Sequence, residues 1–434
     1  MKVRLIIDVT NVLSVPFISG IQRVAREIVV RLAKREAAGE VDLLLLNYDS
    51  ECLDFTHVPT QFFMDYVSQK NVFSGKSDRR GWFRRRGRGG ASQAGVNNTG
   101  LGRMDPASFT HGDVFFDIDS VWNNRMRRSF LLPRLRAQGV KIAVFIQDII
   151  PILYPQYCDR ETAMRFMDFA GAYFRHADLI FANSQQSKED MLSCIRDLQL
   201  ASTRTESTES VDSVRVQNSK RIEVVYLGAD FARSSSAPGK DRKREKENAT
   251  SDSLSESPFL FFLGTMEPRK NIDFLLDVYE SRLRDLGFRV VIAGRPGWNV
   301  DALMQRISHL QKSDPDFLYL PRADDETVAT LFRKAFFTVF PTHYEGYGLP
   351  IVESFLRGTP VLATDIPVLR EVGGDLCDYF LPGDADSLTQ RLMYYKENPD
   401  LYQKRREALR SYTPFTWEET EREIWEGLRS LYQD

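Results

Sequence analysis

The sequence has few cysteines, no long apolar stretch and no excess of charge of either sign. Its 434 residues include four scattered cysteines, Cys52, Cys158, Cys194 and Cys377. They lack the spacing of a zinc site or a redox pair. No apolar run approaches the roughly 18–20 residues of a membrane-spanning helix. The first residues, MKVRLIIDVT, are interrupted by Arg4 and Asp8, which is not typical of a signal peptide. We therefore expect a reduced, cytoplasmic protein that holds no metal.

The charge balance and the length restrict the class of protein further. There are 58 Lys and Arg against 60 Asp and Glu, a net charge of −2. That balance gives no general reason to expect a nucleic acid as partner. With 42% hydrophobic residues, the chain is globular in composition and long enough for two domains.

The apolar pattern predicts two successive series of buried strands. The first series is 4–9, 41–48, 113–119, 141–149, 177–184 and 221–228, and the second is 258–265, 288–294, 316–321, 336–342 and 359–364. Segments with helical spacing separate many of these runs. Ile21, Val24, Ile28 and Leu32 recur at such a spacing. Strands that alternate with helices favour a parallel sheet covered on both faces. The sequence therefore predicts an α/β protein made of two doubly wound halves.

Polar segments of low apolar content suggest the domain boundaries. Residues 232–257 are rich in Ser and charge, and 201–219 and about 74–110 are similar insertions. Such segments cannot bury enough apolar surface to order themselves. We expect an N-terminal domain over 1–231, a flexible linker over 232–257, a C-terminal domain over 258–414, and a final helix over 415–434. Thr416 and Glu419 predict a capping box at the start of that helix.

The insertion near residue 80 contains an arginine-rich stretch with two aromatic residues, Trp82 and Phe83. Its cations are Arg79, Arg80, Arg84, Arg85, Arg86 and Arg88. One interpretation is a disordered surface loop. The other is a basic and aromatic patch that contacts an anionic membrane face or an anionic acceptor, with RNA as a further alternative.

The stretch PTHYEGYGLPIVESFLRGTP (341–360) follows a predicted strand and leads into a helix predicted to start near Pro350. It therefore lies at the carboxyl edge of a sheet, where open α/β sheets bind ligands. Gly346 and Gly348 allow a tight turn and a close approach to a ligand. Helix N–H groups near Leu349 favour an anion. Glu345 and Glu353 can accept hydrogen bonds from sugar hydroxyls.

A second stretch, FFLGTMEPRKN (261–271), again runs from a strand through a glycine turn to a helix. Arg269 and Lys270 stand at the mouth of that helix, and Asn271 is a natural N-cap. Two adjacent cations at this edge are suited to a diphosphate. Together, the two stretches predict a site for a diphosphate that carries a ribose and a second polyol.

Several motifs resemble those of retaining glycosyltransferases of the GT-B fold, in the large family 4 (glycosyltransferase group 1). They are FFLGTMEPRKN, EGYGLPIVESFLRGTPVLAT and the terminal FTWEE, and they cover nearly the whole second half. The first half is similar to the bacterial mannosyltransferase branch through IDVTNVL, SGIQRVAREI, FIQDIIPILYPQY, ADLIFANSQQSKEDM and VVYLGAD.

The resemblance implies two Rossmann-like domains that face a central cleft, with the last helix crossing back to the first domain. It assigns the diphosphate to Arg269 and Lys270, with Gly264 and Thr265 beside them, and the ribose to Glu353. The donor sugar falls to Glu345 and the backbone of Gly346, Tyr347, Gly348 and Leu349. Gly20 would approach the diphosphate from the other domain, although the family's usual pair of glycines is reduced to one in this chain.

One position departs from the family pattern. Gln147 and Asp148 stand where many members have His–Asp, and the imidazole there normally contacts the donor sugar. Glutamine can donate and accept hydrogen bonds but carries no proton at neutral pH. We expect Gln147 and Asp148 to position the sugar or the acceptor.

The resemblance implies transfer with retention, in which the leaving diphosphate takes the acceptor's proton and no metal or other cofactor is required. Asp117–Ile118–Asp119 has the form of an Asp–x–Asp metal motif, but it lies in the other half of the chain from the cation pair. We expect Asp119 to line the acceptor side instead.

The function expected from the sequence is transfer of mannose from GDP-mannose to a lipid-linked or polysaccharide acceptor in O-antigen, capsule or exopolysaccharide synthesis, at the inner face of the cytoplasmic membrane. UDP-glucose, UDP-galactose or another nucleotide-sugar is the first alternative. A nucleotide-sugar epimerase and a non-catalytic nucleotide-sugar-binding module are alternatives from other classes.

Overall fold

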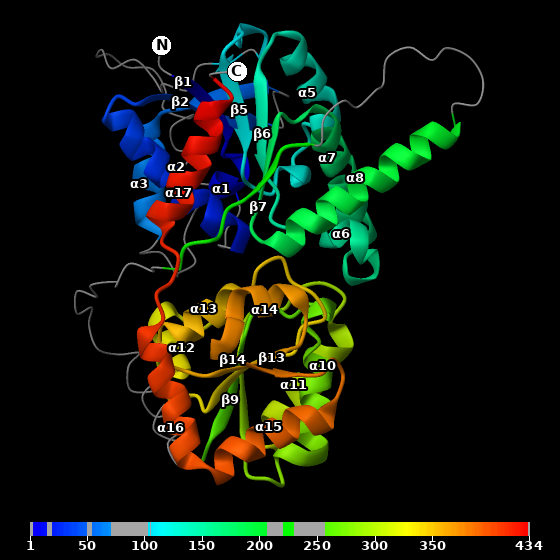
Figure 1. Cartoon of the computed structure of the whole chain (residues 1–434), viewed down its shortest axis with the longest axis vertical. Helices are drawn as coiled ribbons and strands as arrows, with labels where there is room; N and C mark the ends of the chain where they lie inside the picture. The colour runs from blue at the N-terminus through cyan, green and yellow to red at the C-terminus, as the bar shows by residue number, and fades with distance from the viewer. Residues whose placement is uncertain are drawn as a thin grey trace, which may run out of the picture. The chain divides into compact units, whose positions relative to one another are not determined.

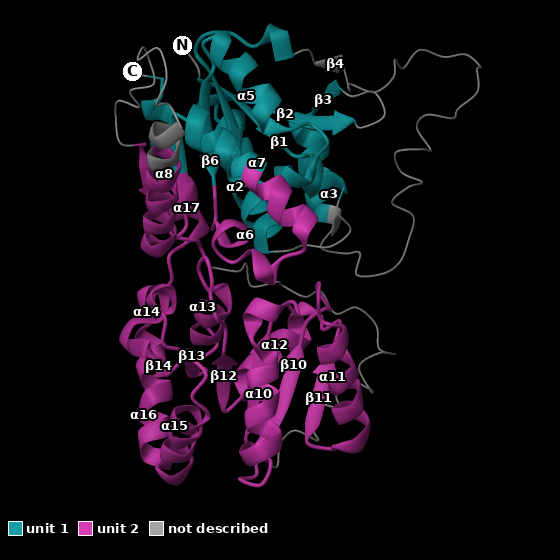
Figure 2. Ribbon diagram, turned by 90° about the vertical axis from the view of Figure 1, so that its right-hand side faces the viewer, with its two compact units in different colours: residues 1–145, 168–180, 424–434 teal, residues 146–167, 181–423 magenta. Residues whose placement is uncertain are grey.

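The protein was analysed as a computed structural model, which describes residues 3–14, 20–49, 54–70, 103–104, 106–205, 220–229 and 257–432. The chain divides into two compact units (Figure 2). Unit 1 comprises residues 1–145, 168–180 and 424–434, and unit 2 comprises residues 146–167 and 181–423. The domain boundaries expected from the sequence stay a prediction.

The first sheet has eight strands in the order β4-β3-β2-β1-β5-β6-β7-β8. Its parallel centre consists of β1 (Val3–Asp8), β2 (Val41–Asp49), β5 (Asp113–Asp117) and β6 (Lys141–Phe145). At one edge, β3 (Asp54–Val58) and β4 (Arg103–Met104) run antiparallel to their neighbours. The other edge is formed by β7 (Leu179–Ala182) and β8 (Ile222–Val224). The apolar runs predicted the other six strands, but not β3 and β4.

Helices connect the strands of the first sheet. The bounds are α1 (Thr10–Ser14), α2 (Gly20–Ala37), α3 (Thr60–Lys70), α5 (Arg128–Ala137), α6 (Ile150–Leu153), α7 (Arg160–His176) and α8 (Gln185–Thr205), with short 3-10 turns η1 (Pro106–Ser108), η2 (Val121–Asn123) and η3 (Pro155–Tyr157). In α2, Val24, Ile28 and Leu32 are fully buried, so the predicted helical stripe is its core face.

The second sheet has six strands, all parallel, in the order β11-β10-β9-β12-β13-β14. They are β9 (Phe259–Leu263), β10 (Arg289–Ala293), β11 (Phe317–Leu320), β12 (Phe337–Phe340), β13 (Val361–Thr364) and β14 (Cys377–Phe380). Numbered within this sheet, the order is 3-2-1-4-5-6, which is that of a dinucleotide-binding Rossmann fold. The sequence predicted every strand except β14.

Helices cover both faces of the second sheet (Figure 1). They are α10 (Ile272–Val278), which continues into the π-helical turn η5 (Tyr279–Leu283), α11 (Asp301–Ser313), α12 (Asp325–Lys334), α13 (Leu349–Phe355), α14 (Pro367–Gly373), α15 (Ala385–Glu397) and α16 (Pro399–Ala408), with 3-10 turns η4 (Pro268–Lys270), η6 (Gly374–Leu376) and η7 (Leu409–Ser411). Along β9, Leu260 and Phe262 pack with α10, whereas Phe259 and Phe261 pack with α12. Burial of both faces explains the continuous apolar runs.

The last helix, α17 (Trp417–Ser430), begins with the predicted capping box. The Glu419 backbone N–H donates to Thr416 Oγ1 at 3.2 Å, and the Thr416 backbone N–H donates to Glu419 Oε2 at 2.7 Å. Trp417, Ile424, Trp425, Leu428 and Leu431 are buried. Within the described ranges, the structure contains no helix with the length and apolar character needed to cross a bilayer.

Candidate functional site

The strand order of the second sheet creates a switch point between β9 and β12. The chain continues from β9 to β10 on one side, whereas β13 and β14 extend the sheet on the other side of β12. Connections that leave the two central strands therefore diverge, and ligands of open α/β sheets bind beyond the strand ends at this point. Arg269 and Lys270 follow β9, and Glu345 follows β12.

Arg269, Lys270 and Glu345 form a cluster of ion pairs. Lys270 Nζ donates to Glu345 Oε1, and Arg269 Nη1 lies 2.7 Å from Glu345 Oε2. Thr342 Oγ1 also donates to Glu345 Oε1, at 2.9 Å. Lys270 is 8% and Glu345 6% exposed. Both carboxylate oxygens of Glu345 are thus occupied, and the acid fixes the positions of the two cations.

Further hydrogen bonds join the loop after β9 to the loop after β12. The Arg269 carbonyl accepts from the His343 backbone N–H at 2.8 Å, and Thr342 Oγ1 lies 3.0 Å from the same carbonyl oxygen. The Arg269 guanidinium donates to the Tyr344 carbonyl at 3.2 Å, and its Nε lies 2.9 Å from Glu267 Oε2. The two loops therefore form one bonded unit.

The charges of the cluster shift the pKa values of its members. Burial alone would raise the pKa of Glu345, but Arg269 and Lys270 outweigh burial and lower it to about 2. Burial and the neighbouring Arg269 lower the pKa of Lys270. For Arg269, burial opposes the charged form, yet Glu345 and Glu267 raise its pKa. Glu345 is consequently ionised at neutral pH.

The loop from Gly346 to Leu349 turns sharply into α13. Gly348 has φ of 110°, a conformation that favours glycine, and α13 begins at Leu349, one residue before the predicted start. A Cβ on Gly346 would lie 2.9 Å from both Asp148 Oδ2 and the Gln147 carbonyl oxygen. Glycine at 346 is therefore required by contact with the chain itself.

Gln147 and Asp148 lie beside this loop in unit 2. Asp148 Oδ1 accepts from the Ile150 backbone N–H at 3.1 Å. Burial raises the pKa of Asp148, and the positive charge of Arg269 opposes that rise. Gln147 Nε2 is buried and has no hydrogen-bond partner among the described residues. The structure therefore brings Gln147 and Asp148 together with Gly346 and the cation cluster.

The other predicted donor residues occupy different positions. Glu353 is buried as the fifth residue of α13. Gly264 follows β9 directly, and a Cβ there would lie 3.9 Å from Lys270 Cε. Thr265 comes next and is half-buried, and Tyr347 is buried with its hydroxyl 3.4 Å from the Leu227 carbonyl oxygen.

Gly20 is the first residue of α2 and belongs to unit 1. A Cβ on Gly20 would have no atom within 4 Å among its described surroundings. The six arginines from Arg79 to Arg88, predicted to contact a membrane or an acceptor, lie outside the described residues.

Asn271 is the N-cap of α10, as predicted, but its side chain takes no part in the cap. It adopts the left-handed conformation with φ of 53°, and its side chain makes no capping hydrogen bond. Asparagine tolerates that conformation better than most residues. The turn therefore depends on the backbone of Asn271 and not on its amide oxygen.

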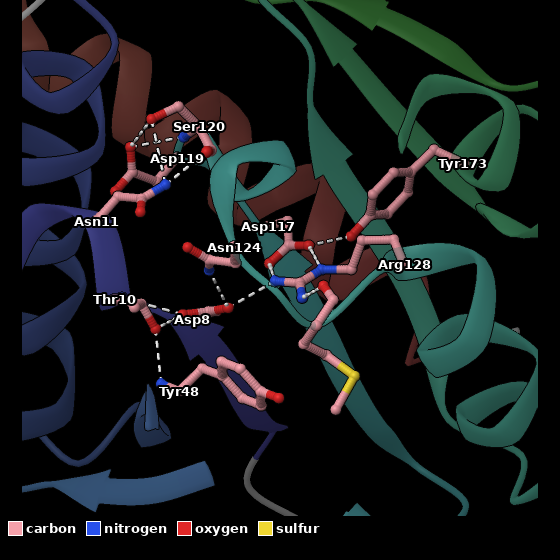
Figure 3. A network of polar contacts seen from close by, with 11 residues as sticks. Asp8, Thr10, Asn11, Tyr48, Asp117, Asp119, Ser120, Asn124, Arg128 and Tyr173 are labelled. Atoms are coloured by element: carbon pink, nitrogen blue, oxygen red, sulfur yellow. Dashed lines mark hydrogen bonds and ion pairs between the residues drawn. The ribbon is translucent and has the colours of Figure 1, made fainter. Parts of the chain in front are cut away.

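Unit 1 contains a buried polar network that the sequence did not reveal (Figure 3). Arg128, from α5, lies 2.6 Å from Asp8 Oδ2 and 2.5 Å from Asp117 Oδ2. Tyr173, from α7, also donates to Asp117. Asp8 ends β1 and Asp117 ends β5, so Arg128 joins the carboxyl ends of two neighbouring strands.

Asp119 belongs to a second group of hydrogen-bonded residues in unit 1. Its Oδ1 accepts from the Ser120 backbone N–H at 2.6 Å, and Asn11 donates to the Ser120 carbonyl (Figure 3). Burial raises the pKa of Asp119 to about 6. Asp117 is paired with Arg128, whereas Asp119 is bonded to Ser120. The two acids of the Asp–x–Asp sequence therefore bond to different residues.

Comparison with known proteins connects this geometry to a family. The family described as "Glycosyl transferases group 1" matches residues 243–413, a range that includes both loops of the cation cluster. Among relatives, "Serotype-specific mannosyltransferase WbdA" of Escherichia coli is 24% identical over 400 residues, covering 91% of this chain and 42% of the relative. The chain thus spans less than half the length of this relative.

Two further relatives have similar names. "O-antigen chain mannosyltransferase B" of Escherichia coli is 34% identical over 145 residues, which cover 32% of this chain and 37% of the relative. "O-antigen chain mannosyltransferase RfbU" of Salmonella typhimurium is 24% identical over 272 residues, which cover 62% of this chain and 64% of the relative.

Solved structures with the same fold include sucrose-phosphate synthase from Thermosynechococcus elongatus, with a TM-score of 0.58, 14% identity and complete coverage of both chains. Anabaena Alr3699/HepE in complex with UDP-glucose has a TM-score of 0.57 and 11% identity, covering 98% of this chain and 99% of that one. Residues 243–413 therefore match a glycosyl transferases group 1 domain, and the chain has the α/β fold of GT-B glycosyltransferases.

Proposed function

We propose that the protein transfers mannose from GDP-mannose, with retention, to a lipid-linked or polysaccharide acceptor in O-antigen, capsule or exopolysaccharide synthesis. The names of the relatives support mannose as the sugar and a surface polysaccharide as the product. The single observation that carries the proposal is the cluster of Arg269, Lys270 and Glu345 at the switch point of the second sheet.

The cluster is suited to a diphosphate because its cations are held in place before a ligand arrives. Lys270 Nζ has three protons and donates to one described oxygen, that of Glu345. Arg269 Nη2 donates to no described residue, whereas Nε and Nη1 are engaged. The remaining donors can neutralise the charge that develops on a departing phosphate. Gly264 and Thr265 form the adjacent backbone.

The other parts of the donor are assigned to the residues that surround the cluster. In this proposal Glu353 binds the ribose, and Glu345 with the backbone of Gly346 to Leu349 binds the donor sugar. Gln147 and Asp148 position the sugar or the acceptor. The buried, unbonded Gln147 Nε2 supports this role, because a sugar hydroxyl would supply the acceptor that the described protein does not.

The chemical step follows from this assignment. The bond between the anomeric carbon and the phosphate oxygen breaks, and the acceptor hydroxyl oxygen forms the new bond on the same face. The hydroxyl proton passes to the leaving diphosphate, so no side chain has to act as base. Arg269 and Lys270 stabilise the diphosphate in the transition state, and the protein holds the acceptor hydroxyl on the same face of the sugar as the leaving diphosphate.

UDP-glucose is the second candidate donor, since Anabaena Alr3699/HepE was solved with it. The decisive experiment screens GDP-mannose, UDP-glucose and UDP-galactose by thermal shift and then by transfer. We expect GDP-mannose alone to raise the melting temperature, because a ligand that binds only the folded state stabilises it. Lys270→Ala should abolish this shift and the transfer, while Lys312→Ala, at an exposed position on α11, should retain both.

Each other outcome identifies a different function. A rise in melting temperature with UDP-glucose alone would identify UDP-glucose as the donor in place of GDP-mannose. Formation of an epimerised nucleotide-sugar without any acceptor would indicate an epimerase. Tight binding without turnover would indicate a binding module, and wild-type transfer by Lys270→Ala would overturn the diphosphate assignment.

We also propose peripheral membrane contact through the arginine-rich segment, on the basis of its composition alone. Deletion of residues 76–103 should reduce cosedimentation with anionic liposomes at low salt. Equal sedimentation of the deleted and full-length proteins would refute this contact.

A further inference from the structure

A cavity of about 590 Å³ lies along the outer edge of β14, away from the cation cluster. Strand β13 separates β14 from β12, and none of the donor-site residues proposed above lines the cavity. Its walls come from β14, from the segment 365–370 and from one face of α15. The volume falls within the roughly 300–1,000 Å³ of small-molecule sites.

The face of α15 that lines the cavity carries polar and aromatic side chains. Ser387, Gln390, Arg391 and Tyr394 recur at the spacing of one helical face. Tyr394 is 47% exposed, and the Arg391 side chain is 45% exposed. A large aromatic ring and a guanidinium are therefore both accessible on the same wall.

The opposite wall contains a second guanidinium and a second aromatic ring. Arg370 lies over the ring of Tyr379 at 4.5 Å, and its Nη2 donates to Asp365 Oδ2 at 2.6 Å. These contacts hold the Arg370 guanidinium over the tyrosine ring, while its side chain stays 57% exposed. The wall therefore presents a guanidinium held in place beside an aromatic ring.

The charges of the lining balance, which restricts the class of ligand. Two arginines, Arg370 and Arg391, face two acids, Asp365 and Asp378. Asp378 is already paired with Arg405 at 2.7 Å. Arg391 lies 4.0 Å from Asp378 and is therefore only weakly paired with it. A nucleotide would meet no net positive charge here, and an apolar ligand would remove water from Arg391 without giving it a hydrogen bond.

We propose that this cavity binds a neutral oligosaccharide, a segment of the growing glycan chain, at a distance from the donor site. Sugar hydroxyls accept from Arg391 and Gln390, and the apolar face of a sugar ring packs on Tyr394. The site retains long acceptors between transfer steps. The inference rests on the proposed function for the identity of the sugar and for the glycan as acceptor.

The test compares mannohexaose and mannobiose with the full chain, in the presence of saturating GDP to occupy the donor site. Tyr394→Ala and Arg391→Ala are surface changes to a good helix former on α15. We expect each to weaken mannohexaose binding at least fivefold by calorimetry and to raise KM for long acceptors by a similar factor. Turnover of a mannobiose acceptor and KM for the donor should not change.

Lys404→Ala, at an exposed position on the neighbouring α16, is the matched control and should bind as wild type. Unchanged mannohexaose affinity in both α15 variants would overturn the inference, as would an equal loss for mannobiose. If the wild type transferred no mannose but bound a hexasaccharide of glucose or galactose through Tyr394, the proposed donor would fail while this site would stand.

Discussion

Replacing Glu345 with glutamine tests whether this acid holds the cation pair. Glu345→Gln preserves the shape of the side chain but removes the charge that faces Arg269 and Lys270. The pKa of Glu345 falls from 4.5 to about 2 in the folded protein, which corresponds to about 3 kcal/mol of folding free energy. Removal of one partner from a buried ion pair costs about 3–5 kcal/mol, so the two values agree.

The pH dependence of this difference has a definite sign. Because the folded-state pKa is depressed, the stabilisation by Glu345 is complete above pH 4.5 and is lost as the pH falls towards 2. At pH 3, about 2 kcal/mol of it should be gone by the linkage relation. Urea unfolding of wild type and Glu345→Gln from pH 7 to pH 3 should therefore show two curves that converge.

Two results would refute this reasoning. Equal urea midpoints at pH 7 would mean that Glu345 is not the anchor of the cations. A difference of constant size down to pH 3 would mean that the variant is destabilised by something other than the lost charge. Hydrogen exchange in peptides covering 259–272 and 337–349 would locate the effect in the two bonded loops.

Two further substitutions test contacts of the site and of unit 1. Gly346→Ala places a Cβ 2.9 Å from Asp148 Oδ2. We expect this variant to lose at least tenfold in transfer rate and about 1–3 kcal/mol in free energy of unfolding. A wild-type transfer rate would show that the loop moves to accept the methyl group. Gly20→Ala, with no neighbour within 4 Å, is the control for stability. Arg128→Met leaves two buried acids unpaired and should cost about 3–5 kcal/mol in urea unfolding; a change under about 1 kcal/mol would contradict the role of this network.

The sequence was informative where a strand is buried on both faces, because such strands are continuous apolar runs. It failed for β3 (DFTHV), β4 (RM) and β14 (CDYF), which include polar residues. Asp378 can stand inside β14 because Arg405 and Tyr395 bond its carboxylate. Those partners lie on helices farther along the chain, so no local pattern indicates them.

The site shows the same division between local and long-range information. The glycine turns, the helix starts and the neighbouring cations are local and were predicted from the sequence. The pairing of Lys270 with Glu345 joins residues 75 positions apart and depends on the order of the strands. The sequence suggested sugar hydroxyls as partners of Glu345, and the structure adds two cations as the partners it already has.

The position of β12 beside β9 has a consequence for biosynthesis. The two basic residues are made early in this half of the protein, but the acid that restrains them arrives only after β10 and β11 have been synthesised on the other side. Until then, Lys270 lacks its partner Glu345, and Arg269 has only Glu267, which precedes it in the chain. The cation cluster is therefore completed only when β12 and the loop after it are in place.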